Sequence, residues 1–327
     1  MAGADCQVVG WQDSGVGCLK WQCAQTFHGL HAVTSPGSAA VIGVFDSGVG
    51  GLSVLRHIRA ALPTEHLLYL ADAGFAPYGE RSEAQIVVRS LAAAFFLAAI
   101  GAKAMVVACN TATAAAIDAI RLQYPALIVV GVEPGLKPAA ELSVSRTVGV
   151  LATAATLGSA RFAQLQAQVT AATGIRFLLQ PCAGLASQVE KGALRAPSTA
   201  RLVTSLVRPL LDQDVDTLVL GCTHYPFVQP LIEAAVAAHG RSGNQIPVQI
   251  VDTGSAVARQ LAVVLRGRGQ LTDGLAPGSV TAYSTGSCST LQQAFKRLLA
   301  LSVPVTGVVL TGAAADYGPV EQNAPAV

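Results

Sequence analysis

Short apolar runs alternate with longer amphipathic segments along most of this chain. From Val41 onward, the short runs are rich in Val, Ile and Leu and predict buried strands, whereas the segments between them have the length and the Ala and Leu content of helices. The strands predicted in the first half are 41–45, 67–71, 105–108 and 128–132, and the helices are 53–62, 83–100 and 112–123. This alternation indicates a parallel sheet covered by helices.

A second series with the same alternation follows. Its predicted strands are 147–151, 176–179, 217–220 and 248–251, and its predicted helices are 159–172, 199–211, 229–238 and 255–266. The last stretch, 280–310, has the pattern strand, helix, strand. We therefore expect an α/β protein with two domains, each a mainly parallel sheet flanked by helices.

The chain is expected to cross twice between these domains. The segment Glu133-Pro134-Gly135 is a candidate for the first crossing and the region near Ile246 for the return. This places residues 41–135 and 247–310 in a first domain and residues 136–246 in a second. Residues 1–40 show no sustained helical or strand periodicity and are interpreted as an N-terminal extension, for which disorder is one interpretation. The tail 311–327 is expected to fray.

Composition narrows the classes of function. The 327 residues are 52% hydrophobic and 12% charged, which suits two α/β domains with full cores. A net charge of +2 does not indicate nucleic-acid binding, and no apolar run is long enough to indicate a membrane span. The first residues do not have the pattern of a secretory signal. Seven cysteines without a C-x-x-C pair indicate free thiols in a reducing cytoplasm.

Several reactive or polar side chains directly follow predicted strands. They are Asp46, Ser47, Cys109, Thr153, Cys222 and Asp252. Ligands bind beyond the carboxyl ends of strands in open parallel sheets, so we expect these side chains to gather at one place. Cys109 and Cys222 end matching apolar runs, which suggests a pair of acid/base groups that face one substrate.

The first predicted strand leads into a glycine-rich segment, residues 46–51. Its backbone N–H groups could approach a phosphate or a substrate carboxylate, although the lysine of a P-loop is absent. The alternative is a tight turn from strand to helix. A near copy at residues 13–17 has no clear helix after it and is interpreted as chance or as a partial duplication.

The other candidate segments also have competing interpretations. Tyr78, in Pro77-Tyr78-Gly79, could close over a ligand or lie in an ordinary turn. Cys109, beside Asn110 and Thr111, could be a thiol base or an inert buried thiol.

The second thiol has a histidine two residues away. Cys222 beside His224 could be a nucleophile, a metal ligand or a proton carrier, but two ligands are too few for zinc and the spacing gives no support to Cys182 as a third. A thiol hydrolase would leave the other cysteine unexplained. Glu190, taken alone, has the pattern of a solvated charge at a helix end.

Taken together, these segments resemble a known family. The matching segments are 42–52, 77–79, 108–112, 221–226 and 251–252, in this order. From about residue 41 to about residue 310, the chain resembles the glutamate racemases of the cofactor-independent aspartate/glutamate racemase superfamily. The sequences of the loop 71–76 and of the segment 181–185 differ from those usual in that family.

The resemblance implies an active site in the cleft between two α/β domains. Cys109 and Cys222 would be the two bases on opposite faces of the substrate α-carbon, with Cys109 acting on D-glutamate and Cys222 on L-glutamate. Asp46 would assist Cys109, and Glu190 and His224 would assist Cys222. The implied substrate-binding residues are Asp46, Ser47, Tyr78, Gly79, Asn110, Thr111, Thr153, Thr223 and His224.

The resemblance also implies a cellular role and a set of partners. It implies L- and D-glutamate as the small-molecule substrate, neither cofactor nor metal, and supply of D-glutamate for peptidoglycan in a bacterial cytoplasm. It is compatible with a homodimer. Neither a nucleic acid nor a membrane is expected as a partner. A racemase for aspartate or another amino acid is the alternative within the superfamily. A non-catalytic amino-acid-binding protein is the alternative outside it, but gives no reason for two matched thiols.

Overall fold

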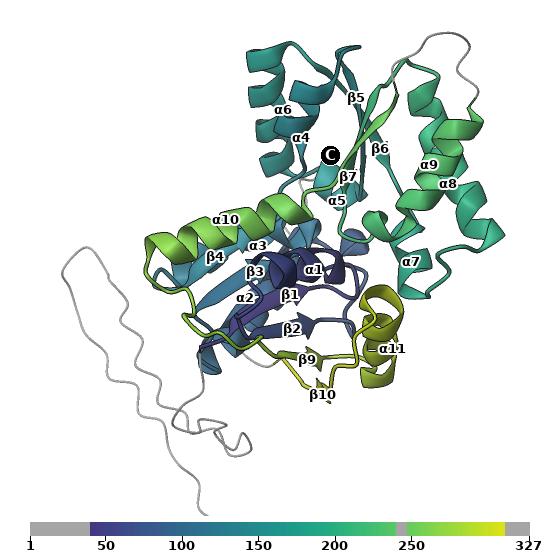
Figure 1. Cartoon of the computed structure of the whole chain (residues 1–327). Helices are drawn as coiled ribbons and strands as arrows, with labels where there is room; N and C mark the ends of the chain where they lie inside the picture. Colours follow the sequence, from purple (N-terminus) through teal and green to yellow (C-terminus); the bar gives the residue numbers. More distant parts are fainter. Residues whose placement is uncertain (1–39, 240–246, 311–327) are drawn as a thin grey trace, which may run out of the picture. The chain divides into compact units, whose positions relative to one another are not determined.

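A computed structural model describes residues 40–239 and 247–310 (Figure 1). The predicted N-terminal extension, the second copy of the glycine-rich segment and the tail from Thr311 lie outside the described residues.

The first sheet has six parallel strands in the order β10-β9-β2-β1-β3-β4. Its strands are β1 (Ile42–Asp46), β2 (Leu67–Ala71), β3 (Ala104–Val107), β4 (Ile128–Gly131), β9 (Val280–Ser284) and β10 (Val305–Gly307). Because β1 and β3 lie side by side in parallel, the residues that follow them come to the same edge of the sheet.

The second sheet has four parallel strands in the order β6-β5-β7-β8. They are β5 (Thr147–Ala152), β6 (Arg176–Pro181), β7 (Thr217–Gly221) and β8 (Gln249–Val251). The predicted α/β class with two parallel sheets is confirmed.

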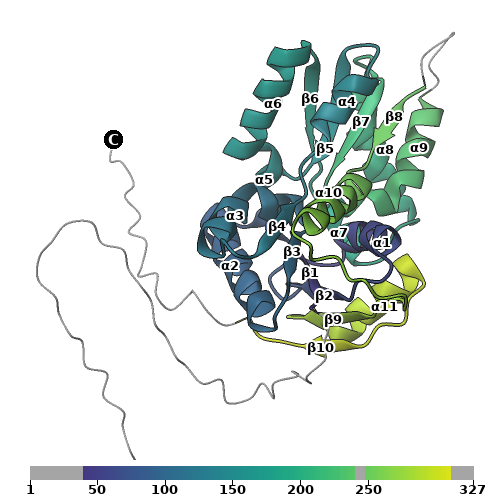
Figure 2. The ribbon, with the colours of Figure 1, turned by 60° about the vertical axis from the view of Figure 1, so that its left-hand side comes forward.

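Helices cover both faces of the first sheet (Figures 1 and 2). One face packs against α1 (Leu52–Ala61), α10 (Gly254–Gly267) and α11 (Cys288–Leu299), and the other against α2 (Glu83–Ala99) and α3 (Asn110–Gln123). Alternate residues of each strand supply the two cores: Val44 faces the first and Phe45 the second. The long helix α2 begins with a capping box, in which Ser82 and Gln85 satisfy each other's backbone N–H groups.

The second sheet is covered in the same way. Its helices are α4 (Leu136–Leu142), α5 (Ala154–Leu157), α6 (Ala160–Thr173), α7 (Leu185–Glu190), α8 (Pro197–Leu211) and α9 (Gln229–Ala238). Two short 3₁₀ helices, η1 (Tyr78–Glu80) and η2 (Tyr225–Val228), lie in loops. The sequence pattern predicted the longer helices but not α4, α5 and α7, which are too short to show a helical period.

One strand lies in a different sheet from the one predicted. Residues 248–251 were assigned to the first domain, but β8 pairs with β7 of the second sheet. The chain therefore returns after Val251, where α10 begins to pack against α1 and β4. The remainder of the predicted domain division stays a prediction.

None of the helices within residues 40–239 and 247–310 has both the length and the hydropathy that a membrane span needs.

A buried ion pair ties down the end of the first sheet opposite to the carboxyl ends of its strands. Lys103, before β3, lies 2.6 Å from Glu65, before β2, and both side chains are almost fully buried. Glu65 also accepts hydrogen bonds from the backbone N–H and the hydroxyl of Thr272, beyond α10. The pair thus joins two strands to the segment that follows α10.

We expect Lys103→Met to lower the free energy of unfolding by about 3 kcal/mol, because it leaves the Glu65 carboxylate buried without its counter-charge. Urea denaturation followed by circular dichroism measures the loss. Lys137→Met, at an exposed position of α4, is the control and should change stability little. Equal stability of the two variants would contradict this prediction.

Candidate active site

Each sheet delivers one cysteine to the site. Cys109 follows β3 and caps α3, where its sulfur accepts a hydrogen bond from the Ala112 N–H at 3.5 Å. Cys222 follows β7 of the second sheet. Both thiols are free and buried.

The two thiols line one small cavity. The other lining residues come from loops and helix starts of both sheets: Ser47, Ala76, Pro77, Tyr78, Gly79, Asn110, Thr111, Thr153, Ala186, Glu190, Thr223 and His224. The cavity volume is about 30 Å³, room for only one or two water molecules. An amino acid can therefore enter only after the cavity opens.

An imidazole and a carboxylate stand in line behind Cys222. The Cys222 sulfur lies 3.5 Å from Nδ1 of His224, and Nε2 of His224 lies 2.7 Å from Oε1 of Glu190. Burial lowers the pKa of His224, but the negative charges of Cys222 and Glu190 outweigh burial and hold that pKa well above its ordinary value. For Glu190, burial acts to raise the pKa. The hydrogen bond from His224 and the positive charge of its ring outweigh burial, so the pKa of Glu190 lies below its ordinary value.

The glycine-rich turn after β1 contacts the same imidazole and carboxylate, His224 and Glu190. Its Val49 N–H donates to Oε1 of Glu190 at 2.9 Å, and its Gly48 N–H donates to Oδ2 of Asp46 at 2.8 Å. A Cβ atom on Gly50 would collide with the His224 ring, so only glycine allows the turn to come this close. At Gly48 and Val49 the N–H groups are taken by carboxylates of the protein itself, which favours the interpretation of a tight turn over that of an anion cradle.

Cys109 has a different environment from Cys222. Its thiol donates to the Ser47 hydroxyl at 3.6 Å. Burial, together with the negative charge of Asp46, raises the pKa of Cys109 to about 12. Asp46 is fully buried below the cavity, where it accepts a hydrogen bond from the Thr223 hydroxyl at 3.3 Å. Asp46 therefore acts on Cys109 through its charge, and burial raises the pKa of Asp46 itself.

Hydroxyl and amide groups form the wall beside Cys109. The Thr111 hydroxyl lies 3.0 Å from that of Thr153 and 3.3 Å from that of Thr156, which joins the start of α3 to α5. The Asn110 side chain is buried, and its Nδ2 has no hydrogen-bond partner among the described residues. An unpaired buried amide donor beside a cavity is suited to a polar ligand group.

A family model described as Asp/Glu/Hydantoin racemase matches residues 42–261 of the chain. The chain belongs to this racemase family. It is an amino-acid racemase.

Curated relatives of this racemase are glutamate racemases. The protein of Ectopseudomonas mendocina (strain ymp) is 49% identical over 263 residues, which cover 80% of this chain and 95% of that protein. The protein of Methylococcus capsulatus is 52% identical over 250 residues, which cover 76% of this chain and 88% of that protein.

Solved structures of glutamate racemases share the fold. The isoform RacE1 from Bacillus anthracis matches with a TM-score of 0.73 and 32% identity, over 83% of this chain and 98% of that chain. The Escherichia coli enzyme, solved with L-glutamate and the activator UDP-MurNAc-ala, matches with a TM-score of 0.70 and 30% identity, over the same shares.

Most of the residues proposed from the sequence lie around the cavity of this racemase. Ten of the residues predicted to be catalytic or to bind substrate line the cavity, in addition to Glu190. They are Ser47, Tyr78, Gly79, Cys109, Asn110, Thr111, Thr153, Cys222, Thr223 and His224. Glu190 lines it too, at the end of α7 as predicted, although the sequence alone favoured a solvated charge. Their catalytic and binding roles stay predictions.

Asp46, which was predicted to bind substrate, is fully buried and is not among the lining residues, and a second expected residue lies farther away. Asp252 was expected to gather with the others because it follows a strand, but it pairs with Arg56 and His57 of α1, each at 3.5 Å. The reason is that the chain crosses back to the first sheet directly after β8, so Asp252 lies beside α1 and not at the cavity.

Some contributors to the site were missed. Thr156 is a buried member of the hydroxyl cluster, and Tyr69, within β2, donates its hydroxyl to the Gly48 carbonyl at 2.7 Å below the glycine-rich turn. A tyrosine inside an apolar strand gives no sequence signal of this contact. Asp72, by contrast, directly follows β2, and the rule that selected the other residues could have found it.

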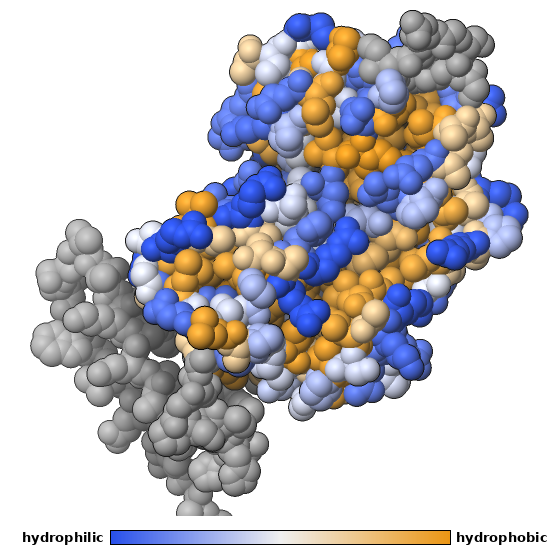
Figure 3. All heavy atoms as spheres, viewed as in Figure 1, coloured by the Kyte–Doolittle hydropathy of each residue, from blue (hydrophilic) through white to orange (hydrophobic). Residues whose placement is uncertain are grey.

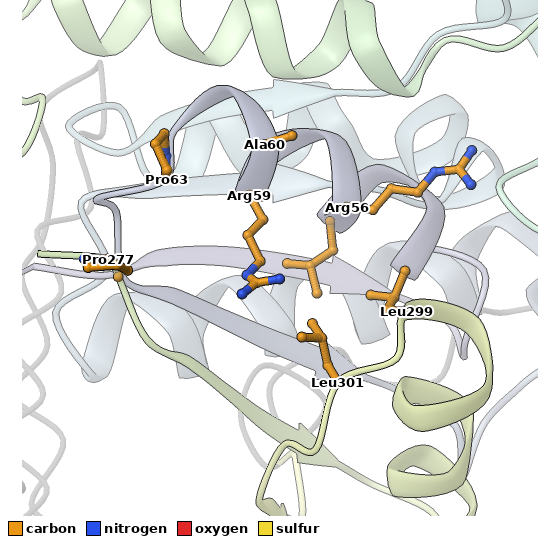
Figure 4. A pocket seen from close by; sticks show the side chains of 9 residues that line it. Arg56, Arg59, Ala60, Pro63, Pro277, Leu299 and Leu301 are labelled. Carbon is orange, nitrogen blue, oxygen red and sulfur yellow. The ribbon is translucent and has the colours of Figure 1, made fainter.

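One larger hollow of the racemase carries no comparable chemistry. A groove of about 250 Å³ lies between α1 and the segments around Pro277 and Leu299, with Arg56 and Arg59 at its side (Figure 4). None of its lining residues is a cysteine, histidine or carboxylate. On the face drawn in Figure 3, hydrophobic and hydrophilic residues are interspersed. Within the described part of the chain, no three His, Cys, Asp or Glu side chains are grouped to hold a metal ion.

We expect Glu190→Gln to lower the pKa of His224, because the variant removes the carboxylate charge that stabilises the imidazolium. The histidine ring signals in NMR, followed against pH, measure this pKa. Glu233→Gln, an exposed position paired with Gln229, is the control and should leave His224 unchanged. The same titration of His224 in both variants would contradict the role of Glu190.

The raised pKa of His224 also has a stability consequence. The stabilisation from its charge is fully present below about pH 6.5, the ordinary value, and is lost as the pH rises through the raised value. Urea unfolding at a series of pH values should therefore show that the free energy of unfolding of the parent protein declines as the pH rises from about 6.5 through the raised pKa of His224. The decline should be smaller in Glu190→Gln.

Proposed function

We propose that this racemase interconverts L- and D-glutamate by proton transfer between Cys109 and Cys222, without a cofactor. The observation that carries the proposal is that two thiols from different sheets line one small cavity. Inversion at a carbon needs an acid and a base on opposite sides of it, and each group must reach the α-carbon from its own side.

The environments of the two thiols support a division of labour for L-glutamate. A buried Cys109 with its pKa raised to about 12 holds its proton and can donate it. The imidazolium of His224, 3.5 Å from the Cys222 sulfur, is an electrostatic partner for a thiolate that can accept one. We infer that Cys222 removes the α-proton of L-glutamate while Cys109 delivers a proton to the other face, and that the roles reverse for D-glutamate.

The α-proton of an amino acid is a very weak acid, so the negative charge that develops must be stabilised by groups already in place. The unpaired Nδ2 of Asn110 and the hydroxyl of Thr111 are the donors at the cavity wall that suit a carboxylate. Thr223 would bind beside them, with its own hydroxyl donated to Asp46. Ser47, Tyr78, Gly79 and Thr153 would complete the binding site. Asp46 would assist through its charge on Cys109, and Glu190 through His224.

Glutamate is the substrate that the relatives favour. The curated relatives at about half identity are named glutamate racemases, and two of the solved structures hold D-glutamate or L-glutamate. We further propose that the product D-glutamate supplies peptidoglycan synthesis in a bacterial cytoplasm. A racemase for aspartate or another amino acid is the second candidate, since the family name includes aspartate and hydantoin.

The proposed activity is tested by incubating the protein with L-glutamate in D₂O without added cofactor. We expect loss of the α-proton NMR signal together with formation of D-glutamate, because the thiol that reprotonates the α-carbon carries deuterium from the solvent. L-aspartate in a parallel sample tests the second candidate. Exchange with aspartate alone would move the assignment to that substrate, and exchange with neither would sink the proposal.

We expect Cys109→Ala and Cys222→Ala each to lower kcat for racemisation by at least about a thousandfold, because each proton step needs its own thiol. The double variant should be little slower than either single one, since the thiols act as a unit. Circular dichroism detection of the two enantiomers measures the rates. Cys288→Ala, at the start of α11 and outside the cavity, is the matched control and should keep its activity. Near-parental racemisation by either single variant would show the two-thiol assignment to be wrong.

A further inference from the structure

A buried carboxylate outside the cavity collects four strong hydrogen bonds. Oδ2 of Asp72 accepts from the Tyr78 hydroxyl at 2.6 Å and from Nε of Arg89 at 2.8 Å. Oδ1 accepts from Nη2 of Arg89 at 2.6 Å and from the Thr285 hydroxyl at 2.7 Å. Asp72 is 0% exposed, and every one of its side-chain acceptor positions is occupied. Such a network fixes whatever is attached to it.

What is attached to it is one wall of the thiol cavity. Pro77, Tyr78 and Gly79 line the cavity, and the Tyr78 hydroxyl is bound to Asp72, so it is occupied by the protein itself. The Tyr78 ring packs edge-on against Phe45 and Phe75, with centroid distances of 6.3 and 6.1 Å. The wall is therefore tied to the first sheet through its only long side chain.

The wall also has little freedom on its other side. A Cβ atom on Gly79 would lie 3.2 Å from Cβ and Cγ2 of Thr153, which follows β5 of the second sheet and caps α5. Beside a cavity of about 30 Å³, a shift of a few tenths of an ångström changes the space for a ligand. The position of this wall must therefore be set accurately by the groups that hold it.

Arg89 is the charged group that holds the network from α2. Its guanidinium binds Asp72 through two nitrogens and lies 5.3 Å from the Phe75 ring centroid. Arg81 stacks on the same ring at 4.6 Å and donates to the Phe75 carbonyl at 3.2 Å. No hydrogen bond or ion pair joins Arg81 to Asp72 within the described residues, so the two arginines separate the effect of the ion pair from that of stacking on the loop.

We propose that Asp72 and Arg89 are positioning residues that fix the Pro77–Gly79 wall and thereby set the affinity for the substrate, while proton transfer stays with the thiols. The kinetic part of this inference rests on the proposed racemase activity. Its structural part, the fixing of the wall, does not.

The kinetic test compares Arg89→Gln and Arg89→Lys with the control Arg81→Gln. We expect the KM for L-glutamate to rise about tenfold or more in Arg89→Gln, with kcat nearly unchanged, because a displaced wall weakens binding without touching either thiol. Arg89→Lys keeps the charge but loses the two-nitrogen geometry and should lie between that variant and the parent. Arg81→Gln should keep the parental KM. A fall in kcat at constant KM, or equal KM values for the two glutamine variants, would overturn the proposal.

A measurement without ligand keeps the inference testable if the proposed function fails. Hydrogen exchange of the backbone N–H groups of Tyr78–Glu80, followed by mass spectrometry, should be faster in Arg89→Lys and unchanged in Arg81→Gln. If Arg89→Gln does not fold, Tyr78→Phe removes one bond of the network and should speed up the same exchange. Parental exchange rates in Arg89→Lys would overturn the proposal, whereas absence of racemisation in the parent would sink only the proposed function.

Discussion

The Glu190 carboxylate is the interaction on which the site depends. Its Oε1 accepts the Val49 N–H from the turn after β1 and lies 2.7 Å from the His224 ring after β7. One oxygen atom thus joins the two sheets and also stabilises the imidazolium beside Cys222. Separation of the sheets at this place would take the Val49 N–H away from Glu190, whereas His224 would stay beside Glu190, because both follow elements of the second sheet.

The two thiols are alike in their strands and unlike in their partners. Burial and the repulsive charge of Asp46 raise the pKa of Cys109 and leave it protonated, although its contacts with Ser47 and with the Ala112 N–H act in the opposite direction. Cys222 has an imidazole that is backed by a second carboxylate. For both to act as bases in turn, as the proposed mechanism would require for the two enantiomers, the charges of the bound substrate must compensate this inequality.

The sequence predicts the sheets well because each strand is short, apolar and bounded by polar residues. The rule that polar residues after parallel strands form sites brought Cys109, Thr153 and Cys222 together correctly, and it would have included Asp72. It failed for Asp252, because the residue after β8 already lies on the path back to α1. The contact of Val49 with Glu190 spans 141 residues, and no local pattern announces a contact over such a separation.

The small cavity has a consequence for the proton itself. Both thiols are buried beside a cavity with room for only one or two water molecules. If the cavity also excludes bulk water once it has enlarged around a bound glutamate, each turnover of the proposed reaction leaves the enzyme as the other of two protonation isomers, with the thiol and the thiolate exchanged. The protonation state of the two thiols would then depend on which enantiomer the protein last converted, until the cavity opens and water restores the distribution of protons. At high substrate concentration, this restoration could limit the rate more than the chemistry on the α-carbon.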